Sequence, residues 1–159
     1  MTKIISPDNT ELLVQILGDI QNKAYIDVVC DVQQQVSELP QLELPVFHHF
    51  APNVYMRQMD APAGTLMVTK MHKTEHFLII LKGSATIQSA DGMSQVYAPQ
   101  IIKTMPGTKR VIYFHEDSSW LTVHPTESTN LLEIENQMIV PDNQIQNFLK
   151  SLEDKGDLQ

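Results

Sequence analysis

The central part of this chain repeats one pattern, in which short apolar segments alternate with turn-forming residues. Turn signals include PAG at 62–64, ADG at 90–92 and PG at 106–107. Short segments with regular turn punctuation are typical of antiparallel β-sandwiches and small barrels. We therefore expect strands at residues 54–58, 65–72, 76–82, 84–88, 94–98, 101–105, 109–114 and 120–124.

Helical patterns flank this β-rich region on both sides. Residues 6–39 carry apolar side chains at helical spacing, in two groups that separate near Gly18, and Pro40 and Pro45 then begin an extended crossing. From Pro141 onward the spacing predicts a capped helix with one apolar face. A chain of 159 residues suits one domain. We expect a helical flank and extended crossing over residues 1–50, a mainly β barrel over 51–126, and a C-terminal segment with a terminal helix over 127–159.

The charge of the chain limits its partners. The formal net charge is −8, which argues against general binding to nucleic acid or to anionic membranes. Seven of the eleven basic residues nevertheless fall between Arg57 and Arg110, where only three acidic residues lie. The chain has one cysteine, no long apolar run and no secretory pattern at its start, so we expect a cytoplasmic protein, in the host cytoplasm if the origin is viral.

Histidines stand beside the most apolar run of the chain, in the segment KMHKTEHFLIILKG at 70–83. If KTE at 73–75 is a tight turn, His72 closes one strand and His76 opens its neighbour, so their side chains can approach across the strand pair. Alternation then places Leu66 and Val68, together with Leu78 and Ile80, inside the barrel. The polar groups would lie at the barrel mouth.

This segment resembles the first motif of the cupin superfamily, which has two histidines, a glutamate and a closing glycine. With Gly83 as the closing glycine, Lys70 and His72 stand at the histidine positions and His76 at the glutamate position. MPGTKR at 105–110 resembles the second motif, with Arg110 in place of its histidine. The resemblance implies a small jelly-roll barrel, also called a double-stranded β-helix. The chain also looks like small cupin-like proteins of bacteriophages and bacteria, which share the H-K-T-E-H and G-T-K-R turns and a strand ending in T-V-H-P-T.

The departures from the cupin motifs favour an anion over a metal. Protonated lysine and arginine offer no lone pair to a metal ion, but they bind phosphate and carboxylate well. Our first hypothesis is a small anionic ligand at the barrel mouth that carries phosphate or carboxylate, a class that includes nucleotide-like molecules. Lys70, Arg110, Arg57 and His124 would bind this ligand. His72, His76 and Glu75 would move protons if the protein is an enzyme.

Two alternatives remain open from the sequence. If Trp120, Thr122 and His124 face inward, His124 could join His72 and His76 as ligands of a divalent iron, zinc, manganese or nickel ion, with Glu75 as a fourth ligand or a base. His72 and His76 could also be a structural pair in an inert barrel, in an assembly protein of a phage or host complex. The apolar stripes of the flanking helices lead us to expect a homodimer.

Overall fold

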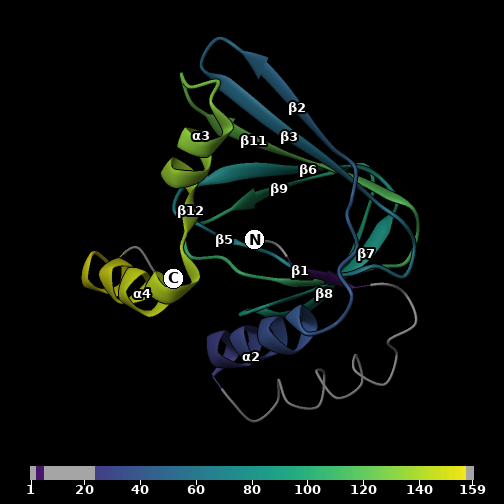
Figure 1. Cartoon of the computed structure of the whole chain (residues 1–159), viewed down its shortest axis with the longest axis horizontal. Helices are drawn as coiled ribbons and strands as arrows, with labels where there is room; N and C mark the ends of the chain where they lie inside the picture. Colours follow the sequence, from purple (N-terminus) through teal and green to yellow (C-terminus); the bar gives the residue numbers. More distant parts are fainter. Residues whose placement is uncertain (1–2, 6–23, 157–159) are drawn as a thin grey trace.

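The computed structural model describes residues 3–5 and 24–156 and shows two antiparallel sheets that face each other (Figure 1). The first sheet has the order β1 (Lys3–Ile5), β4 (Leu66–Val68), β10 (Val111–Phe114), β7 (Ser84–Ser89) and β8 (Gly92–Tyr97). The second has the order β2 (Val46–Ala51), β3 (Val54–Ala61), β11 (Ser118–Pro125), β6 (His76–Lys82) and β9 (Gln100–Thr104). A small third sheet pairs β5 (Met71–His72) with β12 (Ile139–Val140).

The chain passes repeatedly from one sheet to the other. It runs from β6 in the second sheet through β7 and β8 in the first, then to β9, back to β10, and finally to β11. Two facing sheets joined by such crossings form a jelly-roll barrel. The predicted fold class, a mainly β jelly-roll barrel with helices before it and after it, is confirmed.

The barrel interior is a single apolar core between the two sheets. Met67, Leu78, Ile80, Phe114 and Trp120 are all at least 95% buried there, and the Phe114 and Trp120 rings meet edge to face with centroids 5.0 Å apart. Such a T-shaped contact is the preferred arrangement of two aromatic rings. Several residues of this core, among them Met67, Leu78 and Trp120, also line a cavity in the barrel.

One prediction about the core is wrong. Leu66 and Val68 do not fill the barrel, because they face outward and pack under helix α2 (Tyr25–Ser37), while Met67 points inward. The helix buries Val28, Val29, Val32 and Val36 against this outer face. Strand β4 is therefore buried on both faces, and a strand that is apolar on both sides gives no alternation from which its phase can be read.

The helices on either side of the barrel match the sequence-based expectations in part. The expected C-terminal helix is confirmed as a short 3₁₀ turn, η1 (Asp142–Gln144), and α4 (Ile145–Asp154). Of the helical pattern at 6–39, the part before residue 24 lies outside the described residues. No helix in the described part of the chain is long and apolar enough to cross a membrane.

Several elements had no counterpart among the sequence-based expectations, and two of them matter most for the site. Strand β2 occupies the segment expected to be an extended crossing, and it pairs with β3 at the edge of the second sheet. Helix α3 (Leu131–Met138) begins at Asn130, whose side chain accepts hydrogen bonds from the backbone N–H groups of Leu132 and Glu133. Helix α3 leads into β12 at one end of the barrel (Figure 1). This placement puts α3 over the cavity.

Candidate metal and anion site

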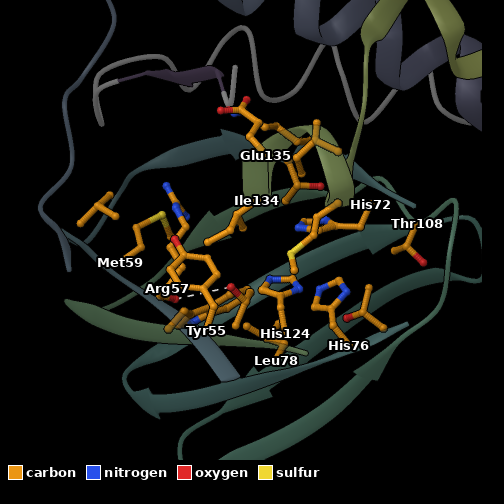
Figure 2. Close-up of a pocket in the computed structure, with 18 of the residues that line it drawn as sticks. Tyr55, Arg57, Met59, His72, His76, Leu78, Thr108, His124, Ile134 and Glu135 are labelled. Atoms are coloured by element: carbon orange, nitrogen blue, oxygen red, sulfur yellow. Dashed lines mark hydrogen bonds and ion pairs between the residues drawn. The ribbon is translucent and has the colours of Figure 1, made fainter. Parts of the chain in front are cut away.

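A cavity of about 440 Å³ lies in the barrel between the two sheets, beneath α3. Part of its wall is apolar, where Met59, Leu78 and Trp120 of the second sheet and Ile112 of the first line it. Polar side chains from several strands line the rest, and Figure 2 shows most of them converging on a common space. Concave, mostly apolar cavities with a few convergent polar groups are the usual form of small-molecule sites.

Three histidines meet in this cavity. His72 ends β5, His76 begins β6 and His124 lies near the end of β11. The ring centroid of His76 lies 4.3 Å from that of His72 and 4.6 Å from that of His124. The rings of His72 and His124 stack with their centroids 5.4 Å apart. One nitrogen from each ring lies within 4.8 Å of the other two. The sequence-based expectation that these three side chains converge therefore agrees with the structure.

Local geometry explains how the three rings come together. The turn at 73–75 returns the chain directly from β5 to β6, so that His72 and His76 lie side by side. Strand β11 pairs with β6 in the register Val123 to Phe77, which places His124 next to His76. Trp120, Thr122 and His124 all face the cavity, as strand alternation from Trp120 predicts.

All three imidazoles are held in the neutral form. Burial is the main cause that lowers the pKa of His72 to about 2, and nearby His76 and His124 add to it. Burial, with smaller contributions from His76 and Arg57, lowers the pKa of His124 to about 3. The pKa of His76 is also lowered, by burial first and by Arg110 next, against a hydrogen bond to the Thr74 carbonyl that raises it. Neutral imidazoles are the form of histidine that binds metal ions.

The hydrogen bonds of the cluster leave lone pairs available. Nδ1 of His76 lies 3.1 Å from the carbonyl oxygen of Thr74. A carbonyl can only accept, so Nδ1 carries the proton and Nε2 keeps its lone pair. Nδ1 of His124 is buried and has no hydrogen-bond partner among the described residues. A buried polar atom without a partner costs about 1–3 kcal/mol, a cost that a bound group at this place would remove. The residues present therefore fit a metal ion.

Two arginines from different sheets also line the cavity. Arg57 lies on β3 and Arg110 immediately precedes β10, and both are half-buried. The guanidinium of Arg110 donates to Oγ1 of Thr104 at 3.2 Å. Within residues 3–5 and 24–156, neither guanidinium forms an ion pair with a carboxylate, although the charge of Glu135 acts on Arg57. Burial lowers the pKa of both side chains, yet arginine stays protonated in proteins.

Lys70 and Glu75 are predicted site residues whose charges are already paired within the protein. Lys70 lines the cavity, but its Nζ forms an ion pair with Oε1 of Glu135 on α3 at 2.5 Å, so its charge is already balanced. Glu75 does not line the cavity. It is exposed in the turn and forms an ion pair with Lys103 on the surface. Its predicted role as a proton carrier or fourth metal ligand therefore receives no support from the structure, because the tight turn directs this side chain to solvent.

Several lining residues were not singled out from the sequence. Tyr55 shares the inward face of β3 with Arg57, a position that strand alternation could have revealed. The hydroxyl of Tyr55 is 2.7 Å from Nδ1 of His48, and its ring stacks with that of His124 at 6.1 Å. Glu135 could not be found without α3, since its contact with Lys70 joins residues far apart in the chain.

The two facing sheets described above form a jelly-roll barrel, so the fold implied by the resemblance to the cupin superfamily is confirmed. No protein-family model and no curated protein matches the chain. Similar solved structures include a cupin-2 domain protein from Shewanella frigidimarina, with 13% identity, a TM-score of 0.43, and coverage of 58% of this chain and 90% of that one. An RmlC-like cupin from Methanocaldococcus jannaschii has 19% identity, a TM-score of 0.45, and coverage of 54% and 82%.

An acetylacetone dioxygenase from Acinetobacter johnsonii is similar to this chain at 17% identity and a TM-score of 0.40, over 52% of this chain and 58% of that one. At these identities and TM-scores, none of the three similarities carries information about activity. The site itself has to indicate the function. The bacteriophage origin considered from the sequence stays a prediction.

Proposed function

We propose that the chain is a metal-dependent cupin that binds a small anionic molecule beside a three-histidine centre. The observation that carries the proposal is the convergence of three neutral imidazoles with candidate ligand nitrogens within 4.8 Å of one another. His72, His76 and His124 would hold a divalent iron, zinc, manganese or nickel ion. When bound, this ion would supply a Lewis acid with positions open to a substrate oxygen, since three protein ligands do not complete its coordination.

The other residues of the cavity would bind and orient the anion. Arg57 and Arg110 would neutralise its charge and donate hydrogen bonds in the fixed geometry of the guanidinium group. The ion pair between Lys70 and Glu135 would help to hold α3 over the cavity and so exclude water. The buried wall formed by Met59, Leu78 and Ile112 would accept the apolar part of the molecule.

A metal-free anion-binding protein is the second candidate. The two half-buried guanidinium groups without a described carboxylate partner favour this function, because a buried charge without a counter-charge is costly. In this case, an imidazole whose N–H faces the cavity would donate a hydrogen bond to the anion.

The predicted homodimer is also a proposal, and the outer face of the second sheet supports it. Phe77 and Leu81 on β6 and Ile101 on β9 are between 51% and 68% exposed on this face. Large exposed apolar patches are typical of protein–protein contacts. Light scattering that gives the mass of two chains, reduced to one by Leu81→Lys with Ile101→Lys, is the expected result. A monomeric wild-type protein would contradict it. In an assembly protein, this face would be the important one and the cavity would have no role.

Metal analysis of protein purified without a histidine tag tests the main proposal. We expect one divalent ion per chain, lost in His72→Ala and in His124→Ala. His115→Ala is the matched control, because His115 is exposed and does not line the cavity. Metal that is absent, or that survives both cavity substitutions, would refute the metal centre. Absence of metal together with a melting temperature raised by phosphate or succinate would support the second candidate.

A further inference from the structure

Among the residues that the structure describes, those lining the cavity carry more positive than negative charge. Its described charged lining consists of Arg57, Lys70, Arg110 and Glu135. Because Lys70 and Glu135 pair with each other, two positive charges remain on the guanidinium groups. The imidazoles add none, since they are neutral. A bound divalent metal would increase the excess. In a partly desolvated cavity, such charge favours a ligand that carries more than one negative charge.

The two guanidinium groups lie at different places around the histidines. Arg57 belongs to the second sheet, and its charge acts on His72 and His124. Arg110 precedes a strand of the first sheet, bonds to Thr104, and acts on His76. In Figure 2, Tyr55 and Arg57 lie on one side of His124, and His72 and His76 lie on the other. A compact anion such as phosphate would meet one guanidinium well, whereas two separated acidic groups could meet both.

The cavity volume limits the size of such a ligand. A volume of 440 Å³ equals that of roughly fifteen water molecules in the liquid. This room suits a molecule of about ten heavy atoms, and the apolar wall formed by Met59, Leu78 and Ile112 suits a short aliphatic chain between its ends. Nε1 of Trp120, buried and without a partner among the described residues, offers one further donor to an oxygen of the ligand.

We propose that the cavity selects a small dicarboxylic acid, with one carboxylate on Arg57, the other on Arg110, and an aliphatic chain between them. The inference rests on the proposed function, since it concerns the anion of the same site. It makes a narrower claim, that the ligand has two separate acidic groups. The claim concerns the arginines and holds whether or not the histidines bind a metal.

Calorimetric titration of the full chain tests this claim. The probes are inorganic phosphate and the dicarboxylates malonate, succinate, glutarate and adipate, each dicarboxylate being compared with the monocarboxylate of the same carbon number at constant ionic strength. Titrations use chelator-treated protein and zinc-loaded protein, and metal content is measured on every sample. We expect the best dicarboxylate to bind at least about tenfold more tightly than its monocarboxylate, because it gains a second charge-assisted, bidentate contact.

Substitutions assign the selectivity to the two arginines. Arg57→Gln and Arg110→Gln should each reduce the preference to below about threefold, because either variant leaves one bidentate contact. Lys82→Gln is the matched control, since Lys82 is exposed and does not line this cavity. Melting curves verify that the variants fold. If Arg57→Gln does not fold, Arg57→Lys takes its place and should retain only part of the preference, since lysine cannot bind a carboxylate bidentately.

Any of three results would overturn the inference. The first is that no dicarboxylate binds more than about threefold more tightly than its monocarboxylate. The others are that phosphate binds more tightly than every dicarboxylate, or that the preference for a dicarboxylate persists in both arginine variants. The metal measurement keeps this failure separate from failure of the metal centre. Selectivity in protein that never binds metal would support the dicarboxylate site and refute the metal centre. Stoichiometric metal without selectivity would do the reverse.

Discussion

Replacing His124 with leucine should stabilise the metal-free protein, although it removes a residue of the proposed centre. His124 is 3% exposed, and its Nδ1 has no hydrogen-bond partner among the described residues. Leucine has a similar volume and no polar atom, so the variant avoids the cost of an unsatisfied buried nitrogen. At pH 7.5 we expect the free energy of unfolding to rise by about 1 kcal/mol.

The advantage of the variant should grow in acid. The pKa of His124 is about 3 in the folded protein, well below the value of about 6.5 expected in the unfolded chain. Between these values the unfolded chain binds a proton that the folded protein does not, so wild-type stability falls as the pH drops below about 6.5 and does not depend on this group above it. Each pH unit corresponds to about 1.4 kcal/mol, which gives about 2 kcal/mol between pH 6.5 and pH 5.

Urea unfolding in the presence of a chelator measures both effects. The fluorescence of Trp120, the single tryptophan, reports unfolding because its side chain is buried in the barrel core. We expect the His124→Leu variant to exceed the wild type by about 1 kcal/mol at pH 7.5 and by about 3 kcal/mol at pH 5. His49→Leu, at an exposed position on β2, is the control for loss of a histidine. A variant less stable than the wild type at both pH values would show that His124 serves the structure and refute this reasoning.

Three further predictions concern the elements around the site. Glu135→Gln should leave the free energy of unfolding unchanged within about 1 kcal/mol, because the ion pair of Glu135 with Lys70 is partly exposed. The same variant should bind succinate more tightly in calorimetry, because it removes a negative charge from the cavity lining. Weaker binding would contradict this reasoning. Val32→Ala should lower the free energy of unfolding by about 2 kcal/mol in urea without loss of metal, and a loss of metal would show that α2 supports the site. Gly83→Ala should destabilise by about 2 kcal/mol or more, since Gly83 has φ +89° and an added Cβ would lie 2.8 Å from Cα of Ser118; a variant as stable as the wild type would contradict this.

The barrel could be predicted because its strands and turns are local features. The strand His76–Lys82 was expected at its observed bounds, since its apolar run ends at Gly83 and begins after a tight turn. The expected continuous strand at 65–72 is instead divided into β4 and β5. The interruption lets Met67 and His72 both face inward, although they are an odd number of residues apart. An unbroken alternation cannot predict such a change of phase.

The sequence contains a start signal for helix α3, although this helix was not among the predicted elements. Asn130 followed by Glu133 has the spacing of a helix start, and Ile134 and Met138 are apolar one turn apart. Both apolar side chains are buried in the structure, beside Tyr55. The consequence for the site is large, because α3 covers the cavity and supplies the carboxylate that balances Lys70.

The candidate site was predictable where strand geometry alone decides it. His72 and His76 converge because of a turn, and His124 joins them through strand alternation and register. Charge balance could not be predicted, since it depends on contacts between distant parts of the chain. Lys70 and Arg110 seemed equivalent in the sequence, yet only Lys70 has a carboxylate partner among the described residues.

X-ray absorption spectroscopy of zinc-loaded protein tests the central claim most directly, because it reports the atoms bound to the metal. We expect three imidazole nitrogens at about 2.0–2.1 Å, recognised by the multiple scattering of their rings, with oxygen completing the shell. The His124→Leu variant should lose this signal. A shell of oxygen atoms alone, a sulfur ligand from Cys30, or a spectrum unchanged in the variant would contradict a centre built from His72, His76 and His124.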